Sequence, residues 1–334
     1  MIGLLSLCVF SMAPLVIDHE QSSIDGEFEQ SIFMPGTLIG NWNEKTNPEG
    51  TSTLPGYWGG SGNNLIACEF TPVLGGPYQS PVMGDLNIEL DTASEILTVD
   101  NLLITAFDGT PATFPVTLGL LFETFRTVQP DSLFPGGVPV DIPLGDGEIT
   151  LMKFEQHELV TASLEPLGGG EWMYFLAVPV NVTVEAVVMD TETGPLLSQG
   201  ILEIEGTIEI VNERYQMIGE VILDSDETVE GPPISFENVP FDVSTVIPQG
   251  ETAHLLVSAV AKSATMMNSA YLHIIARGDV NQQGDVDGDG VVGVNDLLAL
   301  IAVWGQCASC NEDINNDGFV NVTDLLIVIA NWTP

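Results

Sequence analysis

The sequence predicts a mainly β protein, an antiparallel β-sandwich or barrel that carries a small α-helical module at its C-terminus. Three observations lead to this prediction. Between residues 18 and 277, short segments alternate apolar and polar residues with a period of two, and Gly- and Pro-containing turns separate them. This region has no long stretch of helical periodicity. Near the C-terminus, a segment of 20 residues occurs twice at an offset of 28 residues, and each copy ends in an apolar stretch of helical character.

The clearest predicted strand covers residues 178–186, where valine occupies every second position from Val178 to Val184. Residues 201–210 repeat this pattern, with mostly acidic residues between the apolar ones. Such alternation places one face of a strand in the core and the other in solvent. Further strands are expected at residues 116–125, 149–154, 172–176, 254–260 and 271–275.

Two hairpins are expected within this region. Residues 201–211 and 215–223 form the first, with Asn212, Glu213 and Arg214 between the strands. Residues 86–90 and 96–103 form the second. Consecutive antiparallel strands of this kind are typical of both sandwiches and barrels, and the sequence does not decide between them.

The composition favours a folded and strongly acidic protein. The hydrophobic fraction is 45%, which argues against disorder, and 6 Lys and Arg residues stand against 47 Asp and Glu residues, for a formal net charge of −41. Nucleic acid is excluded as a natural partner, because its phosphates require Lys and Arg. Divalent cations remain an attractive ligand, and high ionic strength would relieve the self-repulsion.

The N-terminus is apolar from Ile2 to Ile17 and turns polar at Asp18. We interpret residues 1–17 as a signal peptide and residues 18–277 as the β domain. The alternative is a buried N-terminal strand. At this length the apolar segment is short for a membrane span, so no span is expected in the mature chain.

The repeated segment has the oxygen ligands of a calcium loop, which come from the side chains at loop positions 1, 3, 5 and 12 and the backbone carbonyl at position 7. Gly290 and Gly318 occupy position 6, where the chain turns sharply. Because both sets are complete, we expect two calcium ions. The predicted ligands are Asp285, Asp287, Asp289, the Val291 carbonyl and Asp296 in the first copy, and Asp313, Asn315, Asp317, the Phe319 carbonyl and Asp324 in the second.

Residues 279–334 therefore resemble a type I dockerin, with two loop–helix units in tandem and Asp rather than Glu at loop position 12. The resemblance implies folding around two calcium ions, docking onto a cohesin-like protein, and a secreted or surface-attached bacterial protein. It departs from the family at the recognition positions, where the family has small hydroxyl residues at loop positions 10 and 11 and a basic pair early in the helix. Only Thr323 fits. The other loop positions hold Val294, Asn295 and Val322. The helix positions of the basic pair hold Ile301, Ala302, Ile329 and Ala330.

The cysteines after the N-terminal segment indicate one buried free thiol and one candidate disulfide, and no zinc site. Cys68 lies in an apolar segment and is expected to be a buried free thiol. Cys307 and Cys310 lie between the two calcium loops and are candidates for a local disulfide in an exported protein. Zinc would need two more ligands that the neighbourhood lacks.

Residues 41–64 form a Gly- and Asn-rich segment with three aromatic side chains, Trp42, Tyr57 and Trp58. These side chains are candidates for stacking on the sugar rings of a polysaccharide. The alternative is that they fold back and cover one end of the β domain.

Two functions remain open from the sequence. The first is a non-catalytic, secreted, calcium-binding protein that the dockerin-like module attaches to a protein partner. The second is a glycoside hydrolase or carbohydrate-binding component of polysaccharide catabolism, which the resemblance brings in because dockerins commonly accompany such domains. A hydrolase requires two paired carboxylates, and the sequence cannot identify them among so many acids. No other catalytic motif is present, so we favour the non-catalytic function.

Overall fold

The structure is a computed structural model that describes residues 12–212, 214–280, 284–287, 292–307, 310–315 and 317–332. Strands account for 67% of the residues and helices for 6%, which confirms the mainly β class. The elements are β1 (Ala13–Ile17), β2 (Ser23–Gly40), β3 (Ser52–Pro55), β4 (Ile66–Asp91), β5 (Ile96–Ala106), β6 (Ala112–Phe122), β7 (Phe125–Val128), β8 (Ser132–Phe134), β9 (Val140–Gln156), β10 (Val160–Gly168), β11 (Glu171–Val188), β12 (Thr191–Val211), β13 (Arg214–Glu230), β14 (Ser235–Ser244), β15 (Thr252–Val260), β16 (Ser263–Asp279), α1 (Val294–Ala302), β17 (Gly305–Gln306), β18 (Phe319–Val320) and α2 (Val322–Ala330).

At one end of the main domain, the antiparallel strands close into a barrel. The hydrogen-bonded order β1-β16-β13-β12-β11-β10-β5 continues to β4, and β4 pairs in turn with β1. Side chains at alternate positions of these strands fill the interior, and the largest of the fully buried ones is Tyr174. The barrel alternative is therefore the arrangement at this end of the domain.

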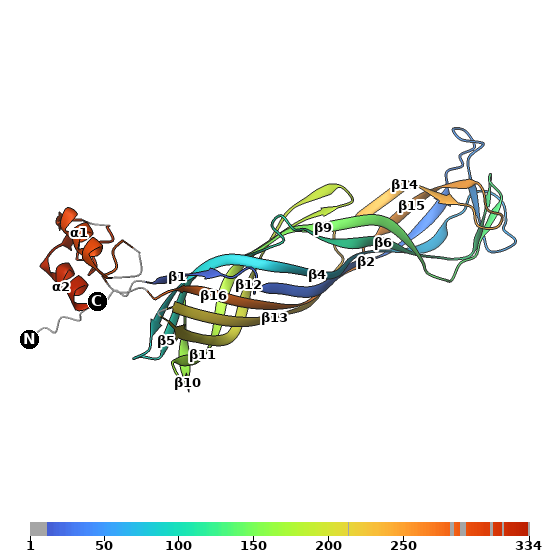
Figure 1. Cartoon of the computed structure of the whole chain (residues 1–334). Helices are drawn as coiled ribbons and strands as arrows, with labels where there is room; N and C mark the ends of the chain where they lie inside the picture. Colours follow the sequence, from blue (N-terminus) through green and yellow to red (C-terminus); the bar gives the residue numbers. More distant parts are fainter. Residues whose placement is uncertain are drawn as a thin grey trace, which may run out of the picture.

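In the middle of the domain the same long strands change neighbours. The order there is β13-β16-β2-β4-β6-β9-β11-β12, because β4 leaves β5 and pairs with β6, and β11 leaves β10 and pairs with β9. β16 is held on both sides, by β13 along its whole length and by β1 and β2 on its other edge. The main domain is consequently long and narrow (Figure 1).

A second core lies at the far end of the domain. There β15 pairs with β2, β14 pairs with β15, and a small sheet forms from β3, β7 and β8. Phe125 and Phe134 of the small sheet stack with ring centroids 4.6 Å apart and pack with Met34, Leu38 and Phe70 of the large sheet. The strands β2 and β4, of 18 and 26 residues, contribute to both cores and join the two ends.

Both predicted hairpins are present. β4 pairs with β5 around Asp91, and β12 pairs with β13 up to the pair Val211 and Arg214. Arg214 is therefore the first residue of a strand and not part of the turn. The segments expected as separate short strands lie within much longer ones, such as residues 149–154 within β9 and residues 172–176 and 178–186 within β11.

Residues 13–17, which we assigned to the signal peptide, form β1 in the sheet. Ala13, Leu15 and Ile17 are buried, and β1 pairs with β4 and β16. Arg277 of β16 donates to the carboxylate of Asp18 directly after the strand. Residues 13–17 thus form a buried strand of the sheet, and residues 1–11 of the expected leader lie outside the described residues, so that cleavage of a signal peptide stays a prediction.

The C-terminal module has its own small core, made by Val286, Val292, Leu300, Val320 and Val328. It follows β16. The last residue of β16, Asp279, forms an ion pair with Arg214, with 2.9 Å between Asp279 Oδ1 and Arg214 Nε. Among the helices that the structure describes, none has the length and apolar character needed to cross a membrane.

Candidate metal centre

The module is a structural duplication at the offset seen in the sequence. Helix α1 begins at Val294 and α2 at Val322, which is 28 residues later, and both helices have nine residues. The core repeats in the same way, because Val292 corresponds to Val320 and Leu300 to Val328. Each unit consists of an acidic loop followed by one helix, as the sequence predicts.

The first loop gathers three of its predicted ligands. Ligand oxygens of Asp285, Asp287 and Asp296 all lie within 4.8 Å of one another. Three carboxylates at this distance repel one another unless a cation lies between them. The other two predicted ligands of this loop, Asp289 and the Val291 carbonyl, lie outside the described residues.

Asp296 links the first loop to its helix. One carboxylate oxygen accepts N–H bonds from Val286 at 2.6 Å and Asp287 at 3.2 Å, and the other accepts from Gly293 at 2.7 Å, which caps the N-terminus of α1. Burial alone would raise the pKa of this carboxyl, but the backbone donors, with Gly293 the strongest, hold its pKa below the ordinary value. Asp296 is therefore a fully buried carboxylate that stays charged.

The second loop is organised by hydrogen bonds from its own backbone. Asp313 accepts from the N–H of Asp317 at 3.1 Å and of Gly318 at 2.8 Å, and Asn315 accepts a second bond from Asp317 at 3.0 Å. Gly318 has a φ of 87°, the left-handed conformation that position 6 of the loop requires. Asp317 accepts in turn from the N–H of Phe319 at 2.9 Å.

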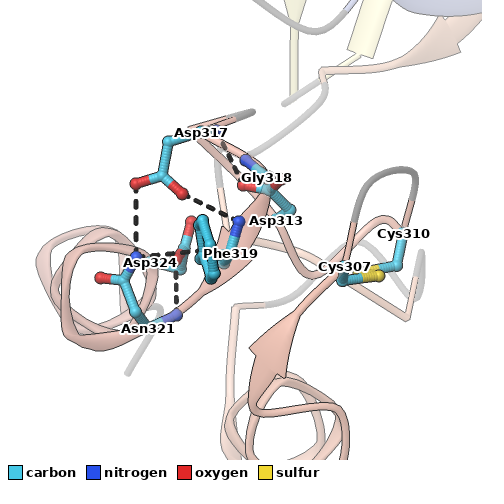
Figure 2. The surroundings of a disulfide bond; sticks show 8 residues. All are labelled: Cys307, Cys310, Asp313, Asp317, Gly318, Phe319, Asn321 and Asp324. Atoms are coloured by element: carbon cyan, nitrogen blue, oxygen red, sulfur yellow. Dashed lines mark hydrogen bonds between the residues drawn. A yellow bond between two sulfur atoms is a disulfide. The ribbon is translucent and has the colours of Figure 1, made fainter.

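Asp324 repeats the role of Asp296 in the second unit. It is fully buried and accepts from the N–H of Asn315 at 3.2 Å and of Asn321 at 2.9 Å, and the second of these bonds caps α2. Figure 2 shows Asp313, Asp317 and Asp324 around the loop, with the Phe319 and Asn321 backbone between them. Asp313, Asn315 and Asp317 thus belong to one hydrogen-bonded loop, and Asp324 in the first turn of α2 joins that loop to the helix.

A disulfide joins Cys307 and Cys310 beside the second loop (Figure 2). The N–H of Cys307 donates to the carbonyl of Gly318, and the carbonyl of Cys310 accepts from the N–H of Asp313. The cross-link therefore fixes the connection between the two units onto the second loop. Cys68, by contrast, is the buried free thiol that the sequence predicts, and burial raises its pKa to about 12.

The donor set fits a hard divalent cation. Every predicted ligand offers oxygen, and the loop geometry suits calcium, which accepts six to eight oxygen ligands in a flexible shell. Carboxylates that are buried or gathered and have no Lys or Arg in the module to balance them require a positive charge from elsewhere.

The two helices, together with one tryptophan just after each of them, expose a duplicated apolar surface opposite the core. Its members occupy equivalent positions at the offset of 28 residues and are all at least 40% exposed. They are Val294, Leu298, Ile301 and Trp304 in the first unit and Val322, Leu326, Ile329 and Trp332 in the second. Thr323, the recognition position that matches the family, is exposed beside this surface.

The aromatic loop lies at the end of the main domain that is far from the module in Figure 1. Trp58 is 94% exposed and Tyr57 57% exposed, so these two side chains do not cover the domain, whereas Trp42 is half-buried. The amide of Asn63 bonds to Gly40, Thr53 and Trp42 and fixes the base of the loop.

Comparison with known proteins identifies the module. Residues 283–333 match the sequence family of the dockerin type I domain. Dockerin type I domains bind calcium, the match implies a cohesin-type protein partner, and proteins with this domain are typically extracellular or cell-surface bacterial proteins. No curated protein matches the chain.

Two of the solved structures that match the chain do so with low TM-scores. They are the outer membrane protease OmpT from Escherichia coli, with a TM-score of 0.23 and 6% identity over 81% of this chain and 98% of that chain, and the secretin domain β-barrel of InvG from Salmonella, with a TM-score of 0.21 and 11% identity over 88% of this chain and 70% of that chain. At these TM-scores neither likeness carries an argument about function.

Proposed function

We propose that this chain is a secreted, non-catalytic protein whose dockerin domain binds two calcium ions and attaches the β domain to a protein partner. The observation that carries the proposal is the gathering of Asp285 and Asp287 with Asp296, which lies in the first turn of α1. A hydrogen-bonded loop with Asp313 and Asp317 precedes α2 at the equivalent position. The disulfide between Cys307 and Cys310 is consistent with an oxidising extracellular compartment.

Calcium would stabilise the module by binding its folded form. The module is small, and its described core has only a few fully buried apolar side chains. Bound cations would add RT ln(1 + [Ca²⁺]/Kd) per site and neutralise carboxylates that otherwise repel one another.

The calcium proposal is tested by titrating the chelator-treated full-length chain with CaCl₂ in a calorimeter. We expect two ions per chain, and one ion in each of the equivalent variants Asp285→Asn and Asp313→Asn. Glu165→Gln, which removes one exposed charge from the β domain, is the matched control and should retain both sites. Stoichiometry of two in all variants would assign the calcium to other residues.

The attachment proposal rests on the duplicated apolar surface of α1 and α2. Because the family's basic pair is absent, contact with the partner would depend on these apolar side chains rather than on Lys or Arg. A purified type I cohesin domain should bind in calcium and dissociate in chelator. The double variant Leu298→Glu and Leu326→Glu should lose binding, whereas Leu159→Glu, at an equally exposed position of the β domain, should not. Equal binding by both variants would exclude this surface.

Carbohydrate binding is a second candidate function for the β domain, and the exposure of Trp58 favours it. A rigid, solvent-facing indole provides a large flat contact with little loss of conformational entropy, and Tyr57 lies next to it. Retention on insoluble polysaccharides such as cellulose, xylan and chitin should fall in Trp58→Ala but not in Trp42→Phe. The same samples should release no reducing ends, and release that is abolished by one Asp or Glu substitution in the β domain would identify a hydrolase.

A further inference from the structure

Two neighbouring strands of the main domain separate and leave their facing edges unpaired. β12 pairs with β11 along its length, but with β13 only from Glu205 to Val211. β13 continues beyond Glu220 with β16 as its partner. Within the described residues, the outer edge of residues 191–204 of β12 and the facing edge of residues 221–230 of β13 therefore have no strand beside them. We call this pair of edges the open seam.

In the middle of the domain, as far as the described residues show, the sheet is closed everywhere except at the open seam, where β12 and β13 are not hydrogen-bonded. In the order of strands there, β13 and β12 are the two ends, and every strand between them has neighbours on both sides. At the barrel end, the pairing of Glu205 with Glu220 through Val211 with Arg214 joins the same two strands. The wall of the domain therefore lacks a strand beyond this junction.

Apolar side chains on the inner face remain exposed along the open seam. Residues two apart in a strand share a face, so Leu196 lies on the side of buried Leu202, and Val229 lies on the side of buried Val221. Met266 of β16 likewise shares the face of buried Ala270. These three side chains are 64%, 55% and 45% exposed, although their strands place them toward the interior.

The outer face of the same edges is apolar as well. Leu197 and Ile201 of β12 are 75% and 62% exposed, and Ile222 of β13 is 72% exposed. A strand that paired with β12 would place its alternating side chains beside these residues on one face and beside the inner residues on the other. Both faces of an added strand would thus find apolar contacts.

From Leu196 to Leu202, the β12 edge lacks the features that usually protect an edge from added strands, whereas its start has Glu192, Pro195 and a register shift between Thr193 and Leu196. β14, the strand at the far end of the sheet order, has Pro240, a bulge between Phe236 and Val239, and the charges Glu237 and Asp242. From Leu196 to Leu202, β12 has no charge and no proline. A long, apolar and unpaired edge is the surface to which extended segments add.

Charge indicates which segment the open seam accepts. Its two edges carry Glu192, Glu203, Asp224, Asp226, Glu227 and Glu230, and residues 191–204 and 221–230 contain no Lys or Arg. A second copy of this chain would bring the same carboxylates and a net charge of −41 against them. A basic segment would instead be attracted, because its Lys and Arg side chains reach the flanking acids.

We propose that the unpaired edge of β12 from Leu196 to Ile204 binds an extended, Lys- or Arg-bearing segment of a partner protein as an additional β-strand. Backbone hydrogen bonds to β12 hold the segment, the apolar side chains along the edge contact its alternating residues, and the acids select for its charge. This interaction is independent of the dockerin domain and of calcium.

The test uses the full-length chain with saturating calcium and a fluorescent nine-residue peptide of alternating Val and Lys. We expect saturable binding by fluorescence anisotropy at 0.15 M salt, and slower hydrogen exchange of the amides in residues 196–204 of β12. The same peptide with N-methyl groups at every second residue keeps its charge but cannot form the ladder, and it should bind at least about tenfold more weakly.

Charge-matched variants locate the site. Leu197→Lys and Ile201→Lys should each weaken binding about tenfold, whereas Val239→Lys, the same charge change on the exposed β14, should change it less than about twofold. Equal binding of the methylated and unmethylated peptides, or equal loss in all three variants, would overturn the proposal, because binding would then be non-specific attraction to an acidic surface. A concentration-dependent dimer that Leu197→Lys abolishes would also overturn it and assign the edge to a second copy.

Discussion

At the scale of single residues, Tyr174 shows how the barrel core accommodates a polar group. Its ring is fully buried, and its hydroxyl donates to the carbonyl of Ile218 on β13 at 2.8 Å. Burial raises the pKa of this phenol well above its ordinary value because the phenolate could not be solvated there. The free energy of unfolding should therefore depend on this residue in two ways.

Tyr174→Phe should lower the free energy of unfolding by about 1–2 kcal/mol at neutral pH, since the Ile218 carbonyl loses a donor. Above about pH 10, unfolded tyrosine releases its proton while folded Tyr174 retains it, so the parent loses about 1.4 kcal/mol per pH unit that the variant does not lose. The difference between the two proteins should thus shrink between pH 10 and 11. Urea unfolding at pH 7, 9, 10 and 11 measures it, and a constant difference would contradict the burial of the hydroxyl.

Asp296 and Asp324 show what the sequence could and could not predict at this scale. Their place at loop position 12 follows from spacing, so the sequence predicts both as calcium ligands. That each also caps its own helix, through the N–H of Gly293 and of Asn321, depends on the conformation between loop and helix. Spacing alone does not contain that information.

At the scale of elements, β1 is short but holds three buried side chains. Leu15→Ala should lower the free energy of unfolding by about 2–5 kcal/mol, because the side chain is fully enclosed where β1 meets β4 and β16. Val16→Ala, in the same strand but 64% exposed, is the matched control and should cost less than about 0.5 kcal/mol.

The same comparison tests the processing of the N-terminus. If a leader were removed after Ile17, the purified extracellular protein would lack β1, and Leu15→Ala and its parent would unfold identically. N-terminal sequencing of that protein decides the point directly. We expect the mature chain to retain Ala13, because its removal would open the ring between β4 and β16.

The predicted strands were those in which apolar and polar residues alternate without interruption, such as residues 178–184 of β11. β4 was predicted only at its end, because Pro72, Pro77, Gly75 and Gly84 interrupt its pattern. In the structure these residues fit a long strand that changes neighbours. A side chain at Gly84 would clash with the carbonyl of Leu103 on β5, and the register shifts just beyond it. Local sequence cannot foresee such changes of partner, nor the separation of β12 from β13 that leaves the open seam.

At the scale of the whole molecule, the charge of −41 opposes folding through repulsion among carboxylates. With calcium saturating, raising NaCl from about 0.01 to 0.5 M shortens the screening length from about 30 Å to about 4 Å and should raise the thermal unfolding midpoint. Scanning calorimetry at several salt concentrations measures the shift. KCl should act equally, and a midpoint that falls with salt would show that ion pairs such as Arg277 with Asp18 outweigh the repulsion.

The pairing of β16 on both edges also determines how the molecule transmits force. The dockerin domain is joined to the end of β16, so tension on an attached partner enters the β domain along the axis of that strand. The ladder hydrogen bonds to β13 and β2 lie across this axis and would be loaded together in shear, whereas a terminal hairpin would be peeled open one bond at a time. A β domain pulled through this strand should therefore resist unfolding under tension more strongly than one pulled through a terminal hairpin.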